Sequence, residues 1–241
     1  MQQLPTISKA DLLALPRAEL KALASQIALL EKRQNENQIQ HYRPYPKQSD
    51  FHARGKTHDE RLLMAANQVG KTLAAGAELS YHLTGDYPDW WQGRRWDRPT
   101  RWWAAGVTQE STRDNPQRIL MGEPAQPTEW GTGTIPGRKI KRTTNARGIP
   151  NAINSIVVKH TSGKESVITF KNYEQGRTKW QGETLDGIWC DEEPPIDLYS
   201  EAQARVAKLK GMIMVTFTPL LGMSEVVRMF LSDSDVKGML G

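Results

Sequence analysis

The chain has almost no cysteine, no long apolar run and little excess of charge of either sign. Cys190 is the single cysteine among 241 residues, which excludes an internal disulfide and a thiolate metal cluster and suits a reducing cytosol. No apolar run is long enough to cross a bilayer, and residues 1–5 do not begin a secretory signal, so we expect a cytosolic protein without a membrane partner. Its 32 basic and 27 acidic residues fit a polyanionic partner, but equally a mildly basic enzyme.

The first forty residues differ from the rest of the chain and are expected to form a helical appendage. Residues 8–11 resemble a capping box, and Pro16 suits the start of a second helix. Apolar residues then fall on one helix face: Leu20, Leu23, Ile27 and Leu30. This stripe would dock a partner subunit or, more commonly, pack on the chain's own domain.

Residues 65–72 indicate a phosphate-binding loop in which alanine takes the place of the usual first glycine. The loop consists of Ala65, Ala66, Asn67, Gln68, Val69, Gly70, Lys71 and Thr72. Backbone N–H groups of such a loop surround the phosphates of ATP, the lysine reaches the β and γ phosphates, and the threonine hydroxyl binds Mg²⁺. An apolar run at 61–66 and helical spacing after the loop predict strand, loop and helix. An ordinary helix start at a glycine is the alternative.

An aromatic and proline-rich segment at 42–52 precedes this predicted strand. Gln48 is our candidate for contacting adenine, because its amide offers a donor and an acceptor together while a neighbouring aromatic covers the base. A glutamine with a structural role in a loop is the commoner explanation.

The middle of the chain contains further strands and two basic segments. Residues 101–107 predict a strand, whereas 153–160 and 165–172 predict a hairpin. The tryptophans and arginines of 84–99 would contact nucleic acid or, more commonly, pack back on the domain. Five positive charges without an acid at 138–147 would contact phosphates if they face a groove; a solvated loop is the more frequent outcome.

A second motif lies at 185–193, an apolar strand that ends in three acids. Asp191 would hold Mg²⁺ beside the phosphate loop, and Glu192 would polarise the attacking water. Taken alone, the acids followed by two prolines would also fit a helix start. A further strand at 212–218 ends in hydroxyls that would report the γ-phosphate. Together these elements predict an α/β fold with mainly parallel strands.

These motifs resemble the large terminase subunit of tailed bacteriophages. The resemblance is carried by residues 65–72, 176–182, 185–192 and 216–219, and it covers roughly residues 42–225. It implies a RecA-type P-loop ATPase domain with a β-hairpin insertion, which would drive double-stranded DNA into a procapsid. The implied partners are the small terminase subunit and the portal protein, and an oligomeric ring of this chain would not be visible in its sequence.

The resemblance also implies a domain division and a role for each motif residue. Residues 1–41 would be the appendage and residues 42–241 the ATPase domain. The implied roles are phosphate binding and Mg²⁺ binding by Lys71 and Thr72, metal support by Asp191, general base catalysis by Glu192, coupling by Thr216 and Thr218, and adenine contact by Gln48.

Two departures from the family pattern matter. Family members often carry an arginine in the phosphate loop, but residues 62–93 contain none, so another arginine is expected to stabilise the transition state. Our candidate is Arg177, acting on the ATP of its own chain or of a neighbouring subunit; an arginine in a surface loop is the commoner explanation. Family members also have a nuclease domain, for which no room follows Thr218, so we expect an ATPase without DNA cleavage.

Two alternatives to the packaging ATPase stay open. The first is another nucleic-acid motor of the same architecture, such as a helicase. The second is an ATP-binding module that docks to a portal or small subunit and turns over negligibly.

Overall fold

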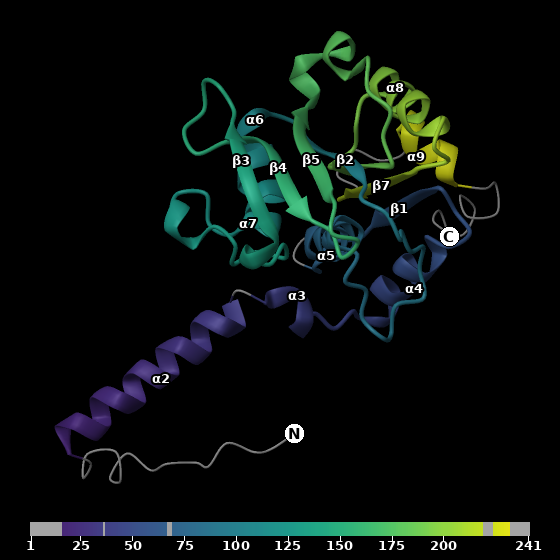
Figure 1. The fold of residues 1–241 in the computed structure, drawn as a ribbon. Helices are drawn as coiled ribbons and strands as arrows, with labels where there is room; N and C mark the ends of the chain where they lie inside the picture. Colours follow the sequence, from purple (N-terminus) through teal and green to yellow (C-terminus); the bar gives the residue numbers. More distant parts are fainter. Residues whose placement is uncertain (1–15, 36, 67–68, 219–223, 232–241) are drawn as a thin grey trace.

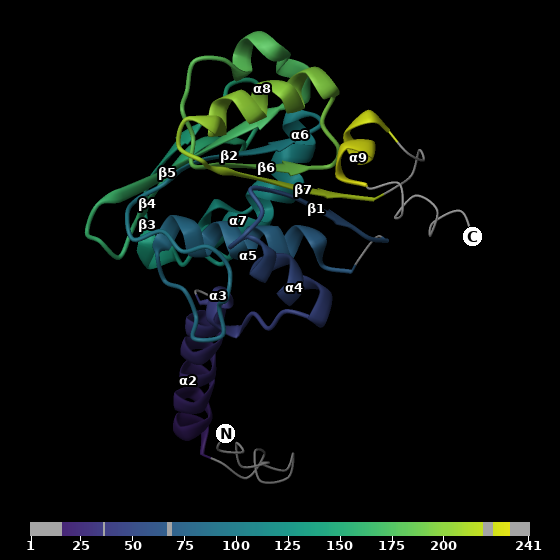
Figure 2. The same ribbon diagram turned by 90° about the vertical axis from the view of Figure 1, so that its right-hand side faces the viewer.

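The computed structural model describes residues 16–35, 37–66, 69–218 and 224–231. Within these ranges the chain forms a mixed α/β fold, with helices on both faces of one seven-stranded sheet (Figures 1 and 2). The capping box predicted at 8–11 and two predicted site residues, Asn67 and Gln68, lie outside the described residues. Among the described helices, none combines the length and the apolar character required to cross a membrane.

The sheet confirms the predicted parallel pairing. Its strands lie in the order β1-β7-β6-β2-β5-β4-β3, and the first five are parallel to one another. The bounds in chain order are β1 Glu60–Met64, β2 Arg101–Gly106, β3 Ile140–Asn145, β4 Ile153–Lys159, β5 Glu165–Asn172, β6 Gly187–Asp191 and β7 Met212–Phe217. The predicted hairpin is formed by β4 and β5, and it extends the main sheet.

Helices cover both faces of the sheet. One face carries α4 Pro46–Arg54, α5 Lys71–Thr84 and α7 Arg118–Met121; the other carries α8 Ile196–Ala207 and α9 Glu225–Phe230 (Figure 2). Neighbouring residues of β2 mark the two layers, because Trp102 packs in the cluster on the α5 side and Trp103 in the cluster on the α8 side. Burial on both faces explains why β2, β6 and β7 read as nearly continuous apolar runs.

Shorter helical turns connect these elements. They are α3 Gln38–His41, α6 Gln109–Thr112, the π-helix η1 Arg113–Gln117, and the 3₁₀ turns η2 Pro127–Glu129, η3 Gly137–Lys139, η4 Tyr173–Gln175 and η5 Arg177–Trp180. The polar cap predicted after the second strand is confirmed: the Thr108 hydroxyl accepts a hydrogen bond from Ser111 N at the start of α6.

The predicted N-terminal helix is α2, Arg17–Asn35, which begins directly after Pro16. It projects away from the sheet and its covering helices (Figure 1). Leu20 and Leu23 are half-buried, while Ile27 is 46% exposed. The described part of the N-terminal segment enters the core only at Ile39, which packs against α5. The division at residue 41 stays a prediction.

The two basic segments have different outcomes: a solvated loop, the commoner expectation for 138–147, is wrong for residues 140–145, whereas the commoner expectation for 84–99 is confirmed. Residues 140–145 form the edge strand β3 and pair with β4, where the open sheet edge offers backbone partners that a solvated loop would leave to water. The segment at 84–99 packs back on the domain: Trp91 is 4% exposed, Arg94 pairs with Asp59, and Arg98 pairs with Asp186 at 2.6 Å.

Candidate nucleotide-binding site

The candidate site lies at the carboxyl edge of the sheet, where the neighbouring strands β1, β7 and β6 end. Ala65 follows β1, Thr218 follows β7, and Asp191 is the last residue of β6. Carboxyl ends of parallel strands meet at one edge, which is where ligands bind in open α/β sheets. The predicted strand before the loop and the helix after it are confirmed as β1 and α5. The N-terminal end of α5 adds partial positive charge at this edge.

Lys71, the first residue of α5, folds back on the loop. Its Nζ donates to the carbonyls of Ala65 and Ala66 at 2.8 and 2.7 Å and to the Thr218 hydroxyl at 3.1 Å. An ammonium group has three donors, so all of them are engaged within the protein. A phosphate entering the loop has to compete with these three acceptors.

Asp191 receives two hydroxyl donors on one carboxylate oxygen. Thr216 donates to Oδ1 at 2.9 Å and Thr72 donates to the same atom at 3.3 Å. Burial raises the pKa of Asp191 to about 6, although both hydrogen bonds favour the charged form. A carboxylate beside a threonine hydroxyl fits Mg²⁺, which binds through few protein oxygens together with phosphate and water. Within the described residues, no cluster of three histidine, cysteine, aspartate or glutamate side chains offers another metal site.

Glu192 has an exposed side chain on a tightly held backbone. Its φ is +71°, in the left-handed region that residues other than glycine rarely adopt. The backbone N–H donates to the Thr216 carbonyl at 2.7 Å, and the carbonyl accepts the hydroxyl of Tyr173 at 2.6 Å. These two bonds hold the strained conformation and direct the carboxylate away from the core.

The side chain of Gln48 binds backbone carbonyls of the loop. Its Nε2 donates to the Gly70 carbonyl at 3.1 Å and more weakly to that of Val69 at 3.4 Å, while its Oε1 accepts the Tyr45 N–H at 2.9 Å. Gly70 has a φ of +78°, and a Cβ there would lie 2.9 Å from the Gln48 amide. Both the left-handed backbone and the close approach require glycine at this position.

A cavity of about 1360 Å³ lies between the segment at 41–48 and the loop. Tyr45, which is 69% exposed, and the buried Gln48 both line it. An aromatic face beside apolar side chains suits a purine base. Both ends of the Gln48 amide are already bonded within the protein, so a contact with adenine would replace one of these bonds. That contact stays a prediction.

Arg177 is not brought to the loop by any contact within the described residues. It lies in η5, is 61% exposed, and pairs with Glu201 of α8 at 3.0 Å between Nε and Oε2. The predicted role on a neighbouring subunit's ATP is not tested by these contacts and stays a prediction.

Tyr173 is the site residue that sequence reasoning missed. Its ring is buried at the end of β5, and its hydroxyl supports the backbone of the predicted general base. An aromatic after an apolar strand usually signals core packing, so the sequence contained no pattern that distinguishes this tyrosine. Only the adjacency of β5, β2 and β6 brings it to Glu192.

Three features define a phosphate-binding-loop protein. They are a mostly parallel α/β sheet, a glycine in the left-handed conformation followed by lysine and threonine at a helix start, and a carboxylate on a nearby strand. Residues 62–237 match the family described as "Terminase large subunit, T4likevirus-type, N-terminal". The chain belongs to this family of large terminase subunits.

Two kinds of relative accompany the family match. The large terminase subunit of Salmonella phage P22 is 38% identical over 220 residues, covering 84% of this chain and 44% of its own length. The chain therefore spans less than half of this curated relative. The large terminase of a thermophilic bacteriophage, solved in complex with ADP, aligns with a TM-score of 0.47 and 14% identity, over 81% of this chain and 49% of that one. A second structure of the same phage's large terminase gives 0.46 and 16%, over 72% and 38%.

Proposed function

We propose that this chain is the ATP-hydrolysing motor part of a viral DNA-packaging terminase, which couples Mg²⁺-dependent ATP hydrolysis to translocation of double-stranded DNA into a procapsid. The observation that carries the proposal is the meeting of Lys71, Thr72, Asp191 and Glu192 at one sheet edge. Membership of the large terminase family supports it. A nucleotide site without a second carboxylate to activate water would bind ATP without hydrolysing it. Here the exposed Glu192 directly follows the buried Asp191.

The contacts of these residues support the following roles in the proposed reaction. Lys71 exchanges its carbonyl partners for the β and γ phosphates, and the backbone of Ala65, Val69 and Gly70 lines the phosphates together with Asn67 and Gln68. Thr72 and Asp191 would hold Mg²⁺, which would supply positive charge to the phosphate oxygens. Glu192 would accept the proton of the attacking water while the water oxygen forms a bond to the γ phosphorus. The bond from that phosphorus to the β–γ bridging oxygen would break, and the oxygen would leave as part of ADP.

The proposal extends to coupling and partners. Thr216 and Thr218 lie on and just after β7, between the lysine and the aspartate, and would relay the state of the γ-phosphate. Arg177 would stabilise the transition state of a neighbouring copy in a ring. The expected partners are double-stranded DNA, the small terminase subunit and the portal protein, in the cytosol of the infected cell. Residues 42–241 would form the motor domain and residues 1–41 an appendage.

ATP hydrolysis by Lys71→Ala, with and without duplex DNA, tests the central assignment. We expect a loss of at least tenfold in the rate, while Lys208→Ala, which removes an exposed lysine after α8, retains it. Full activity of Lys71→Ala would overturn the assignment. Stimulation of the wild-type protein by duplex supports a motor, and strand separation on a forked duplex would support the helicase alternative.

The role of Glu192 is tested by Glu192→Gln, which keeps the size of the side chain and removes the base. We expect ATP binding to be retained and hydrolysis to fall by about 10²–10⁴-fold. Equal rates in the variant and the wild-type protein would remove Glu192 as the base and favour a binding module with negligible turnover.

A further inference from the structure

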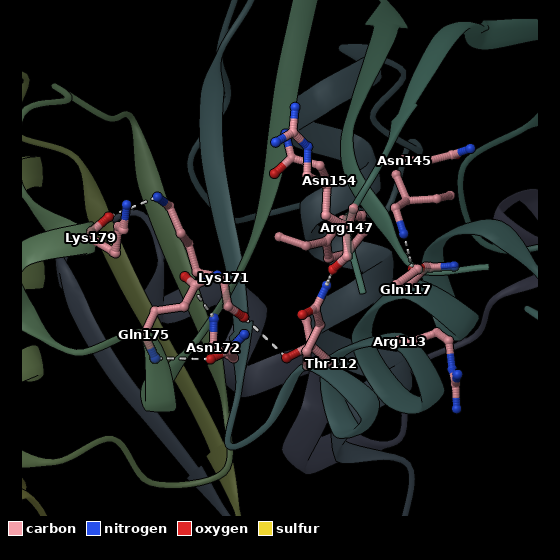
Figure 3. Close-up of a pocket in the computed structure, with 15 residues that line it drawn as sticks. Thr112, Arg113, Gln117, Asn145, Arg147, Asn154, Lys171, Asn172, Gln175 and Lys179 are labelled. Atoms are coloured by element: carbon pink, nitrogen blue, oxygen red, sulfur yellow. Dashed lines mark hydrogen bonds between the residues drawn. The ribbon is translucent and has the colours of Figure 1, made fainter. Parts of the chain in front are cut away.

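A second cavity lies on the same carboxyl edge of the sheet, beyond the nucleotide site. It has a volume of about 570 Å³ and is formed where β2 and β5 end beside the β3–β4 hairpin. All of its charged lining residues are basic: Arg113, Arg147, Lys171 and Lys179. Figure 3 shows the two lysines on one side of the cavity and the two arginines on the other. We call it the basic pocket.

The four cations differ in how far the protein already neutralises them. Arg113 is paired with Asp114 through two bonds of 2.7 and 3.0 Å. Lys171 is half-buried, which lowers its pKa, and its Nζ donates to the Lys179 carbonyl at 2.8 Å. Arg147 and the Lys179 ammonium have no ion pair with any described residue, and both side chains are exposed. The pocket therefore presents two uncompensated charges across a hollow.

The polar lining is also rich in amide groups. Gln109, Asn145, Asn154 and Gln175 contribute them. Guanidinium, ammonium and amide donors are the groups that contact phosphate oxygens and sugars in protein–DNA interfaces. Positive charge continues outside the pocket along β3, where Lys141 and Arg142 are exposed and, among the described residues, only Arg142 has a carboxylate partner, Glu165 at 3.7 Å. A ligand with several phosphates in a row reaches both the pocket and this strand, whereas a single phosphate fills only one of them.

One wall of the basic pocket is joined to the predicted general base. Asn172 and Gln175, which line the pocket, bracket the turn η4 and cap it, because Asn172 Oδ1 accepts the Gln175 N–H at 3.1 Å. Tyr173 lies within this turn, and its hydroxyl donates to the Glu192 carbonyl at 2.6 Å. A ligand that contacts η4 would therefore act, through Tyr173, on the strained backbone of Glu192.

We propose that the basic pocket binds the phosphodiester backbone of double-stranded DNA, and that Tyr173 transmits its occupancy to Glu192, so that bound DNA accelerates hydrolysis. The choice of DNA as the polyanion rests on the proposed function. The pocket and the hydrogen bond that links it to Glu192 are observed in the structure, whatever the ligand. Tyr173 acts as a positioning residue, since its hydroxyl contacts the backbone of the base.

Binding of a fluorescently labelled duplex, measured by anisotropy against salt concentration, tests the pocket without ATP. We expect Arg147→Ala and Lys179→Ala each to lower the slope of log K against log salt by about one. Lys56→Ala, which removes an exposed lysine after α4, is the matched control and should keep the wild-type slope. Unchanged slopes in the pocket variants, or equal losses in the control, would overturn the proposal.

Other anions are separate arms of the same experiment. If inorganic phosphate at duplex-equivalent phosphate concentration displaces the labelled duplex, the pocket is a single-phosphate site and the proposal fails. Binding of a labelled acidic peptide that depends on Arg147, without such dependence for the duplex, would assign the pocket to a protein partner instead.

The link to Glu192 is tested by Tyr173→Phe, which keeps the ring and removes the hydroxyl. We expect unchanged duplex binding and KM for ATP, with loss of the duplex-stimulated increase in kcat. Tyr199→Phe removes another buried tyrosine hydroxyl, the one that donates to Glu60, and should keep the stimulation ratio. If Tyr173→Phe lowers the rates with and without DNA by the same factor, the hydroxyl has only a structural role and the proposed link to Glu192 fails. If the wild-type protein hydrolyses no ATP, the proposed function fails, and the salt slopes still decide the pocket.

Discussion

Glu78 is the centre of a buried polar network that joins α4, β1 and α5. It accepts hydrogen bonds from Arg61 at 2.5 and 3.2 Å, and it contacts His52 at 2.7 Å and His82 at 3.3 Å. Burial alone would raise the pKa of Glu78, but the Arg61 guanidinium and the two histidines hold it well below its usual value. Tyr42 bonds His52 in turn, so the network extends toward the segment that supports the loop.

Replacement of Glu78 by glutamine leaves Arg61 buried without a compensating charge. Arg61 is 4% exposed, and breaking a buried pair of this kind costs about 3–5 kcal/mol of the free energy of unfolding. Urea unfolding of Glu78→Gln measures this loss. Glu165→Gln, which removes an exposed partner 3.7 Å from Arg142, should change the value by less than about 0.5 kcal/mol. Similar losses in both variants would contradict a special role for the buried network.

Asp191 illustrates a conflict between function and stability. Its native pKa of about 6 lies above the usual value for aspartate, so the native state binds the proton more tightly than the unfolded state. The stabilisation from this proton is complete at about pH 3 and is lost as the pH rises through about 6. In chelator, Asp191→Asn should therefore gain about 3 kcal/mol over the wild-type protein at about pH 8 and little at about pH 3. It should also lose ATP hydrolysis.

Urea unfolding at both pH values checks this expectation. Asp89→Asn, at an exposed aspartate, serves as the control and should show no comparable gain at the higher pH. An Asp191→Asn variant that is less stable than the wild-type protein at the higher pH would show that the two threonine hydrogen bonds outweigh the cost of burying the charge.

At the scale of elements, the contact between β2 and β6 depends on one glycine. Gly187 is paired with Trp102, and a Cβ on Gly187 would lie 2.3 Å from the tryptophan ring. The ring is 1% exposed and stacks on His82, with centroids 5.3 Å apart and an interplanar angle of 10°. This packing leaves the ring no open space to move into.

Gly187→Ala should lower the free energy of unfolding by about 1–3 kcal/mol through overpacking. Trp102→Phe provides a smaller ring, so the double variant should recover part of that loss. A double-mutant cycle with a coupling above about 0.5 kcal/mol would confirm the contact, whereas additive losses would contradict it.

Local sequence patterns predicted most elements but not all of their partners. The strands β1, β2, β4, β5, β6 and β7 and the helix α5 follow apolar periodicity and turn residues, and the loop motif located Lys71 and Thr72. The strand β3 is basic and carries little apolar pattern, because an edge strand has one exposed side. The bond from Tyr173 to Glu192 depends on the strand order, and the bonds around Glu78 join segments far apart in the sequence. Such contacts leave no local signature.

At the scale of the whole molecule, the packed body begins near Ile39. Ile39 and Tyr42 pack with Tyr81 of α5 and with Trp91, whereas the described side chains of α2 enter none of the core clusters. The projecting helix in Figure 1 is therefore expected to contribute little to the stability of the body.

Deletion of residues 1–35 should leave the thermal midpoint within about 2 °C of the full chain, since changes below about 0.5 kcal/mol move it little. Deletion of residues 1–44 also removes Ile39 and Tyr42 and should lower the midpoint by several degrees. Differential scanning calorimetry compares the three proteins. A large drop on the shorter deletion would show that the α2 stripe packs on its own domain.

Lys71 gives the nucleotide site an internal competitor. Under the proposed function, nucleotide reaches the ammonium only by displacing it from Ala65, Ala66 and Thr218, so rearranging the ends of β1 and β7 offsets part of the binding free energy. Thermodynamic linkage makes this relation reciprocal. Suppose that a partner binds the end of β7 with different affinity when Lys71 contacts the carbonyls and when it contacts phosphate. That partner must change the affinity for ATP by the same factor by which ATP changes the affinity for the partner. The internal contacts of Lys71 would thus couple ATP binding to partner binding at the end of β7, in both directions.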